Sequence, residues 1–334
     1  MSLALADRVH LAQLPTPLHK LERLSREWGV DLWIKRDDLT GSALSGNKIR
    51  KLEFELAEAL RTGCKAVVTC GGVQSNHARA TAIAARRLGL VPHLVLRTDD
   101  GTPPAELDGN TLLDRIVGAE ITWVSRPQYS NERAAIMADI AEEMRGRGLP
   151  AMVIPEGASD ARGSMGYVSF IPELQAQAGA AGLSRIDYLV HACGSGGTSA
   201  GLAIGNEIFA ADMLPVAFAV CDDEKYFRDV TAKIFDEFAE KFAGIAAGAR
   251  PRLLINDQYK GIGYAKSTRE ELDFIRKVAE TEGILLDPVY SAKAFFGMAQ
   301  EIAKRKTFRA GSTICFVHTG GIFGLFPKKH EFGF

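Results

Sequence analysis

The chain has 334 residues, of which 46% are hydrophobic and 24% are charged, and its formal net charge is -1. These values are typical of folded globular enzymes, and the length favours two domains or one large domain. The near-neutral charge and the lack of a dense Lys/Arg run argue against nucleic acid or a membrane surface as a partner, so we expect a small molecule.

The N-terminal segment and the cysteines bear on the cellular compartment. Asp7, Arg8 and His10 interrupt any apolar region of a signal peptide, and no segment reaches about 18 uncharged apolar residues. The five cysteines are an odd number, and none has the spacing of a zinc site or a redox pair. We therefore expect a cytoplasmic protein with free thiols and no bound metal.

Short runs rich in Val and Ile alternate with longer segments of helical period, which is typical of parallel sheets wrapped by helices. The predicted fold class is α/β. An earlier and a later set of strands could form two sheets with a cleft between them. The predicted strands are 66–70, 93–96, 121–124, 152–154, 188–192, 216–220 and 314–318.

Two helices are predicted near the ends of these strands. One covers 77–88 and ends at Gly89. The other follows Asn47, has a regular apolar face and ends at Gly63. Lys48 would thus stand at a helix start, where its side chain can face a cleft.

A glycine-rich turn lies between the predicted strand 188–192 and a helical segment. Backbone N–H groups in such a turn can point at a phosphate, hydroxyl groups add donors, and the helix N-terminus favours an anion. A tight structural turn is the alternative explanation. The turn consists of Gly194, Ser195, Gly196, Gly197 and Thr198.

The same turn could belong to a nicotinamide-dependent oxidoreductase. The dinucleotide fingerprint requires a third glycine where Ser199 stands, and it normally opens the first strand-turn-helix unit of the fold. No lysine of the P-loop type follows the glycines. A monophosphate is therefore favoured over a dinucleotide or a nucleoside triphosphate.

A second polar loop, residues 71–77, follows the strand 66–70. Ligands of open α/β sheets bind at the carboxyl ends of the strands, so its side chains are candidates for a binding site. Ser75 or Asn76 could equally serve only as the N-cap of the next helix. His77 has no partner at metal-ligand spacing, and a structural role is its simpler explanation.

Lys48 is a candidate for a Schiff-base lysine, which needs a partly desolvated amine. The neighbouring Arg50 and Lys51 could lower its pKa by their charge, although a basic helix start is more often a solvated surface. Near the C-terminus, Tyr264 and Tyr290 could donate protons or contact a ring.

Seven separated motifs, from about residue 10 to residue 326, together resemble the D-cysteine desulfhydrase and 1-aminocyclopropane-1-carboxylate (ACC) deaminase family. This resemblance implies a pyridoxal-phosphate enzyme of fold type II, similar to the tryptophan synthase β-subunit, with two open, twisted, mostly parallel sheets. It also implies a homodimer whose active site lies between a large domain (1–50 plus 165–334) and a small domain (51–164). The motifs are TPL (16–18), IKRDDLTG (34–41), GNKIRKLEF (46–54), QSNH (74–77), GSGGT (194–198), LDPVYSAK (286–293) and HTGG (318–321).

The resemblance assigns roles to individual residues. The Schiff-base lysine falls on Lys48, and the phosphate loop falls on 194–198. Asn76 is expected to hydrogen-bond the phenolic oxygen of pyridoxal phosphate, and Thr319 to approach its pyridine nitrogen. The catalytic residues are expected to be Lys48, Ser75, Tyr264 and Tyr290, and the substrate contacts Ser75, Asn76, His77 and Ser291.

The two branches of the family differ at two of these positions. The deaminases resemble PVYEGK and HLGG, whereas this chain has Ser291 and Thr319 in place of the glutamate and the leucine. A carboxylate near the ring nitrogen would favour its protonation and strengthen the electron sink that carbon-carbon cleavage needs. Two hydroxyl groups favour β-elimination instead, with Lys48 or Ser75 removing the Cα proton.

The predicted reaction is therefore the conversion of a small amino acid, most simply D-cysteine, to pyruvate, sulfide and ammonia. ACC deamination to 2-oxobutyrate and ammonia is the first alternative. SNHAR (75–79) and DPVYSAK (287–293) also resemble L-cysteate sulfo-lyases, which act on the opposite configuration, but the acidic run at 222–224 would oppose a sulfonate if it lies near the cleft. A non-catalytic pyridoxal-phosphate-binding protein is the alternative from another class.

Overall fold

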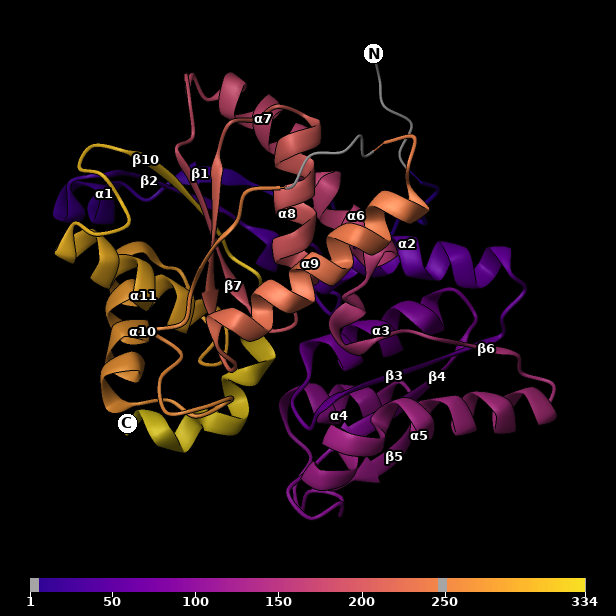
Figure 1. Ribbon diagram of the computed structural model, residues 1–334. Helices are drawn as coiled ribbons and strands as arrows, with labels where there is room; N and C mark the ends of the chain where they lie inside the picture. Colours follow the sequence, from indigo (N-terminus) through magenta and orange to yellow (C-terminus); the bar gives the residue numbers. More distant parts are fainter. Residues whose placement is uncertain (1–5, 246–250, 334) are drawn as a thin grey trace.

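The computed structural model describes residues 6–245 and 251–333, and their strands form two separate, mostly parallel sheets (Figure 1). This confirms the predicted α/β class. The larger sheet has the order β1-β2-β10-β7-β8-β9, and only its β1–β2 pair is antiparallel. Its strands are β1 (Leu18–Lys20), β2 (Asp31–Lys35), β7 (Tyr188–Cys193), β8 (Leu214–Ala219), β9 (Leu254–Asn256) and β10 (Thr313–Val317).

The smaller sheet has the order β5-β4-β3-β6 and is parallel throughout. Its strand β4 begins at Val91, earlier than predicted, so that Pro92 lies inside it. The pairing of β4 with β5 starts only at His93, beyond the proline. The strands are β3 (Ala66–Gly72), β4 (Val91–Arg97), β5 (Glu120–Val124) and β6 (Ala151–Val153).

Three strands of the larger sheet were not predicted from the sequence. β1 and β9 have only three residues each, which is too short for a periodic pattern. β2 reads DLWIK, and its charged ends concealed a strand that pairs in parallel with β10. The N-terminal segment thus joins a sheet whose other long strands come from the second half of the chain.

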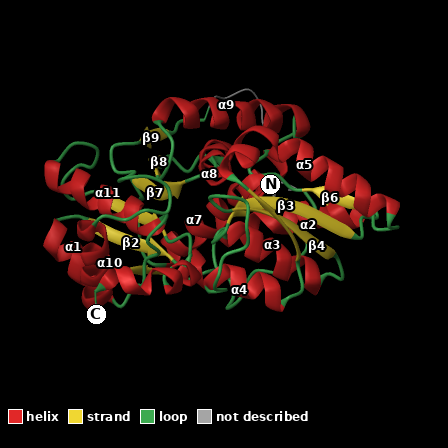
Figure 2. Cartoon of the chain, turned by 90° about the horizontal axis from the view of Figure 1, so that it is seen from below, coloured by secondary structure: helices red, strands yellow, loops and turns green. Residues whose placement is uncertain are grey.

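Helices surround both sheets, as Figure 2 shows from below. α3 begins one residue before the predicted start. The helices are α1 (Glu22–Trp28), α2 (Lys48–Arg61), α3 (Asn76–Arg87), α4 (Gly109–Ile116), α5 (Arg126–Gly146), α6 (Ala161–Val168), α7 (Phe170–Ala180), α8 (Gly197–Ile208), α9 (Glu224–Lys241), α10 (Arg269–Glu282) and α11 (Ser291–Lys304). Short 3₁₀ helices are η1 (Asp37–Leu39), η2 (Glu156–Ala158), η3 (Ile322–Gly324) and η4 (Phe326–Phe332).

Helix α6 packs closely against both α2 and α8. A Cβ atom on Gly166 of α6 would lie 2.4 Å from the Arg50 carbonyl oxygen, and one on Gly201 of α8 would lie 2.4 Å from the Ser164 carbonyl oxygen. Only glycine permits these distances. The close packing holds the start of α2, with Lys48, beside the turn that precedes α8.

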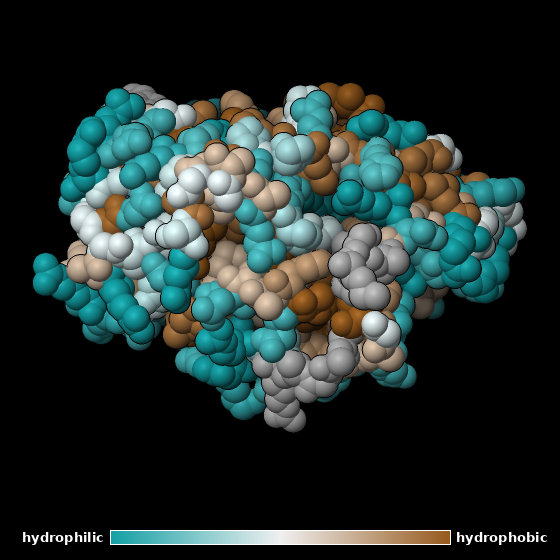
Figure 3. All heavy atoms as spheres, turned by 90° about the horizontal axis from the view of Figure 1, so that it is seen from above, coloured by the Kyte–Doolittle hydropathy of each residue, from teal (hydrophilic) through white to brown (hydrophobic). Residues whose placement is uncertain are grey.

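The strands of the smaller sheet all lie between residues 66 and 153, and those of the larger sheet lie on both sides of this range. The predicted domain boundaries at 50/51 and 164/165 fall inside α2 and α6; the division itself stays a prediction. Figure 3 shows the face seen from above, on which hydrophilic areas surround hydrophobic ones. Among the described residues, no helix has both the length and the apolar character needed to cross a membrane.

Candidate active site

The glycine-rich turn lies at the carboxyl end of β7 and leads directly into α8. Gly196 has φ +83°, and a Cβ atom on Gly194 would lie 2.8 Å from the Tyr290 ring. The first N–H groups of α8 have no acceptor within the helix, and they carry the positive end of its dipole. The turn is therefore shaped to receive an anion.

Lys48 faces the same pocket as this turn. Its amine forms no hydrogen bond or ion pair with the described residues, and burial lowers its pKa to about 8. About a tenth of the amine is then neutral and nucleophilic at pH 7, far more than for an ordinary lysine. The residues that line the pocket come from segments far apart in the sequence: Asn47, Lys48, Asn76, Ala192, Cys193, Gly194, Ser195, Gly196, Thr198, Ser199, Tyr290, Thr319 and Gly320.

The loop before Lys48 is fixed from two directions. The Asn47 amide nitrogen Nδ2 donates to the Thr198 hydroxyl at 3.0 Å, and the Asn47 backbone N–H donates to the Thr319 carbonyl oxygen at 3.0 Å. Gly46 has φ +109°, and a Cβ atom there would lie 2.9 Å from that carbonyl oxygen. The glycine of the GNK motif is thus required by its backbone conformation and by this contact.

Lys51 lies at the base of the glycine-rich turn, a position that we did not predict. Its Nζ donates to the Gly157 carbonyl oxygen at 2.5 Å and to Ser159 Oγ at 3.1 Å. Ser159 Oγ in turn donates to Ser195 Oγ at 2.8 Å. Burial holds the pKa of Lys51 well below its ordinary value, and the charge of Lys48 lowers it further. An anion in the turn would compensate this buried amine.

Tyr264 and Tyr290 form a pair, with their hydroxyl oxygens 2.6 Å apart. Burial is the main cause that raises the pKa of Tyr264 to about 12, so both groups stay protonated at neutral pH. Tyr290 lines the Lys48 pocket, whereas Tyr264 lines a neighbouring cleft of about 870 Å³. The cleft and the pocket share Gly194 and Ser195, so that the tyrosine pair stands where they meet.

Gly197 and Tyr264 do not line the Lys48 pocket, and neither do three other predicted site residues. Ser75 caps α3, its Oγ accepting from the Ala78 N–H at 3.1 Å. His77 Nε2 lies 2.8 Å from Thr69 Oγ1 of β3, and burial keeps the pKa of its ring well below the ordinary value. Ser291 begins α11, and its hydroxyl donates to Asp287 Oδ1 at 2.7 Å. The structure gives each of the three a structural partner.

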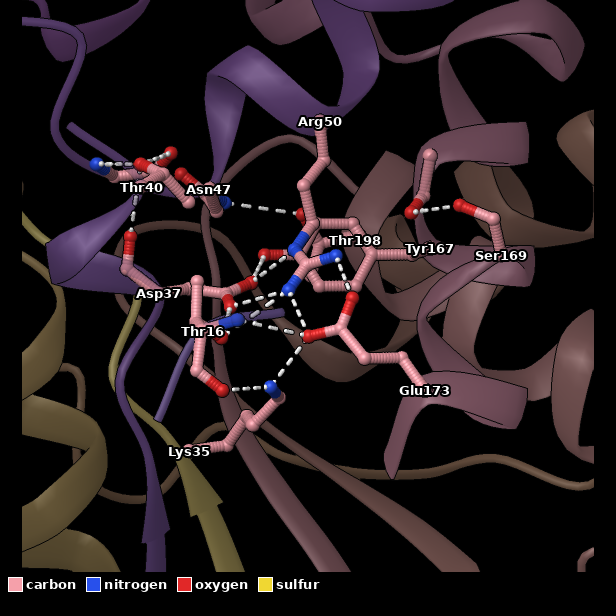
Figure 4. Close-up of polar contacts among 12 residues, drawn as sticks. Thr16, Lys35, Asp37, Thr40, Asn47, Arg50, Tyr167, Ser169, Glu173 and Thr198 are labelled. Atoms are coloured by element: carbon pink, nitrogen blue, oxygen red, sulfur yellow. Dashed lines mark hydrogen bonds and ion pairs between the residues drawn. The ribbon is translucent and has the colours of Figure 1, made fainter. Parts of the chain in front are cut away.

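The expected effect of Arg50 on Lys48 was wrong, because Arg50 belongs to a separate buried ion cluster (Figure 4). Its guanidinium lies between the carboxylates of Asp37 and Glu173, at 2.8 Å from each, and Lys35 Nζ is 2.5 Å from Glu173. Burial would raise the pKa of Glu173, but Arg50 and Lys35 bring it down to about 2. The cluster is neutralised internally, and burial is the main cause of the lowered pKa of Lys48.

The acidic run was expected to oppose a sulfonate if it lies near the cleft. Asp222 does line the cleft, but Asp223 caps α9 and Glu224 pairs with Arg228. The cleft also contains Arg97, whose guanidinium has no ion pair with the described residues. The electrostatic argument against a sulfonate is therefore weak.

Pyridoxal phosphate fits the residues of the pocket. The anion cradle with Lys51 beneath it can hold the phosphate, and the free amine of Lys48 can bind the aldehyde carbon. Thr319 offers a hydroxyl and Asn76 an amide to the edge of a ring. Among the described residues, no group of His, Cys, Asp and Glu could hold a metal ion.

Known proteins are similar to this chain in sequence and in fold. Residues 9–320 match the family model described as pyridoxal-phosphate dependent enzyme. The bifunctional D-cysteine desulfhydrase/ACC deaminase of Arabidopsis thaliana is 43% identical over 96% of this chain and 80% of its own length. The D-cysteine desulfhydrase of Yersinia enterocolitica serotype O:8 is 37% identical over 97% of this chain and 96% of its own length.

Solved structures agree with these relatives. The crystal structure of an ACC deaminase homologue superimposes with a TM-score of 0.87 at 40% identity, over 98% of this chain and 95% of that one. The processed form of threonine deaminase isoform 2 from Solanum lycopersicum shares the fold at a TM-score of 0.62 and 18% identity, over 93% of this chain and 80% of that one. The chain therefore belongs to the pyridoxal-phosphate dependent enzyme family.

Proposed function

We propose that the chain is a lyase that uses pyridoxal phosphate to eliminate the β-substituent of a small amino acid, most simply D-cysteine. Water and D-cysteine would give pyruvate, sulfide and ammonia. The observation that carries the proposal is the unpaired, desolvated amine of the half-buried Lys48 in the same pocket as an anion cradle. The desulfhydrase and deaminase names of the relatives support this reaction class.

The bound cofactor supplies an electron sink for the Cα carbon of the amino acid. The chain itself must position the substrate and move protons. Lys48 can accept the Cα proton because its lowered pKa leaves part of the amine neutral. The hydroxyl pair of Tyr264 and Tyr290 can donate a proton toward the departing sulfur.

Thr319 supports elimination over ring opening. Thr319 lines the pocket, and we assign it to the pyridine nitrogen of the cofactor. Its neutral hydroxyl provides no negative charge to favour protonation of that nitrogen. Ser291 occupies the position of the glutamate in the PVYEGK motif of the deaminases, and its hydroxyl donates a hydrogen bond to Asp287. A weaker electron sink suits a β-substituent that leaves readily.

ACC deaminase activity is the second candidate. Relatives named putative ACC deaminase, such as that of Thermotoga maritima at 43% identity over 97% of this chain, favour it. L-cysteate sulfo-lyase activity is a third, and the unpaired Arg97 in the cleft favours it. D-cysteine and L-cysteate would both give pyruvate but release sulfide and sulfite, respectively, whereas ACC would give 2-oxobutyrate.

Two measurements test the proposal. Purified protein loaded with pyridoxal phosphate should be yellow, and borohydride should fix the cofactor on Lys48, as peptide mass spectrometry would show. Keto acid formation from D-cysteine, L-cysteine, L-cysteate and ACC then identifies the substrate. A protein that stays colourless with added cofactor would refute the proposal, and binding without turnover of any substrate would favour a non-catalytic cofactor-binding protein.

We further propose that the protein is a cytoplasmic homodimer. All five cysteines lie among the described residues and are free, which suits a reducing compartment. Ile116 and Phe326 are 68% and 51% exposed and could be covered in a dimer. Light scattering of the purified protein would measure its mass against the 36.2 kDa of one chain.

A further inference from the structure

Asn76 contributes the only amide side chain besides Asn47 among the described residues that line the Lys48 pocket. Which end of this amide faces the pocket decides whether it offers a hydrogen-bond donor or an acceptor there. Its Oδ1 accepts from Asn110 Nδ2 at 3.0 Å. The orientation of Asn110 therefore determines the orientation of Asn76.

Asn110 lies at the start of α4 and is fully buried. Its Oδ1 accepts from Arg79 Nε at 3.1 Å, and its Nδ2 donates to the Gln74 carbonyl oxygen at 3.1 Å as well as to Asn76. A guanidinium cannot accept a hydrogen bond and a backbone carbonyl cannot donate one. The amide of Asn110 can satisfy both neighbours in one orientation only.

The guanidinium of Arg79 also has a fixed orientation. It is completely buried, and its two terminal nitrogens donate to the carbonyl oxygens of Ala43 at 2.6 Å and Ser45 at 2.9 Å. Its guanidinium also lies over the Phe323 ring at 5.0 Å. Burial lowers the pKa of Arg79 to about 10, so the group still carries its proton at neutral pH.

We infer that Asn110 is a positioning residue. Its contact with Arg79 fixes the orientation of its own amide, and its contact with Asn76 Oδ1 leaves Asn76 Nδ2 as a hydrogen-bond donor in the pocket. The inference rests on the proposed function and takes as the acceptor for Asn76 the phenolic oxygen of pyridoxal phosphate, the partner that the family resemblance implies for this residue. A donor stabilises the negatively charged form of that oxygen, and an acceptor in the same place repels it.

The variant Asn110→Asp tests this polarity with almost no change of shape. The aspartate keeps its contact with Arg79 but cannot donate to Asn76, so the Asn76 amide should turn its oxygen toward the pocket. We expect the dissociation constant for pyridoxal phosphate to rise about 10-fold to 100-fold, the loss of one charge-assisted hydrogen bond. The yellow band of the loaded protein should weaken in favour of near-ultraviolet absorption, because the phenolic oxygen then retains a proton.

Two further variants separate positioning from general damage. Thr111→Val removes the hydrogen bonds that the next residue of α4 donates to the Val73 carbonyl oxygen and accepts from Gln74 Nε2, but it leaves Asn110 intact, and both readouts should stay at their wild-type values. In an Asn76→Ala background, Asn110→Asp should add no further change, because the two residues act through one interaction. Asn110→Ala offers a second test if the aspartate variant does not fold, and it should weaken binding in the same direction.

The outcomes distinguish the inference from the proposed function. If wild-type protein does not bind pyridoxal phosphate, the proposed function fails. If it binds and turns yellow, but Asn110→Asp and Asn110→Ala keep its dissociation constant and its spectrum, the inferred positioning of Asn76 by Asn110 is wrong. An equal effect of Asn110→Asp with and without the Asn76 amide would also overturn it.

Discussion

Lys51 lies one helical turn after Lys48 on α2, and its amino group donates to the Gly157 carbonyl oxygen at 2.5 Å, directly beneath the glycine-rich turn. The two lysines thus face one site from one helix face. In the proposed function, Lys48 would bind the aldehyde of the cofactor and Lys51 its phosphate. This division of roles can be tested with cofactors that differ only in the phosphate.

Replacing Lys51 by alanine should weaken pyridoxal phosphate binding about 10-fold to 100-fold, because an ion-paired hydrogen bond to the phosphate is lost. Equilibrium dialysis of wild-type and Lys51→Ala protein measures this change. Binding of pyridoxal, which lacks the phosphate, should stay the same in both proteins. An equal loss for both ligands would mean that Lys51 supports the fold of the turn and does not contact phosphate.

The pKa of Lys48 predicts how cofactor capture depends on pH. Only the neutral amine attacks the aldehyde, so the rate at which cofactor-free protein turns yellow should rise with pH, with a midpoint near 8. An ordinary lysine would give a midpoint near 10.5. Since the negative charge of Glu156 raises the pKa of Lys48, Glu156→Gln should move the midpoint to lower pH. A midpoint that stays in place would exclude this influence of Glu156.

Ser75 combines a demonstrated N-cap contact with a proposed chemical role. Ser75→Ala should lower the free energy of unfolding by about 1 kcal/mol, and Ser75→Gly by a few tenths, because glycine is the better cap of the two. If the hydroxyl assists transfer of the Cα proton, both variants should slow Cα-proton exchange equally, as followed by NMR in deuterated water. Undiminished exchange in either variant would leave Ser75 as a cap only.

The paired tyrosine hydroxyls suggest a matched pair of variants in the cleft. Tyr264→Phe removes a 2.6 Å hydrogen bond and a proton donor, and kcat for keto acid formation should fall at least about 10-fold. Tyr226 of α9 lines the same cleft but is 46% exposed, and Tyr226→Phe should leave kcat unchanged. Equal effects of the two substitutions would argue against a role in proton donation.

Much of the architecture was predictable because buried parallel strands leave continuous apolar runs in the sequence. The seven predicted segments all coincide with strands, whereas β2 was missed because its charged ends conceal its pairing with β10. The candidate site was predictable where a loop follows a strand, as in 194–198. The position of Lys51 could have been inferred from its spacing of three residues from Lys48 on one helix.

Asn110 and Ser159 could not have been predicted in the same way. Asn110 lies 34 residues after Asn76, and Ser159 lies 36 residues before Ser195. No local pattern marks such partners, because only the tertiary fold brings them together. Arg50 shows the reverse error: its sequence position beside Lys48 suggested an electrostatic effect that the carboxylates of Asp37 and Glu173 cancel.

The buried cluster around Arg50 predicts a specific sensitivity to acid. The pKa of Glu173 is about 2 in the folded protein and 4.5 in an unperturbed glutamate, so its contribution to stability is complete above pH 4.5. That contribution is lost as the pH falls from 4.5 to 2, because the unfolded chain then binds the proton more readily. The contribution is about 3 kcal/mol, since one pKa unit corresponds to about 1.4 kcal/mol.

Glu173→Gln should therefore be less stable than the wild type at pH 7 and should lose less stability on acidification. Urea unfolding between pH 7 and pH 3 gives the free energy of unfolding of both proteins, and the difference between them should shrink below pH 4.5. Glu240→Gln is the matched control, because Glu240 is exposed on α9 and forms no ion pair with the described residues. A difference between Glu173→Gln and the wild type that stays constant with pH would show that the Glu173 carboxylate does not contribute through its charge.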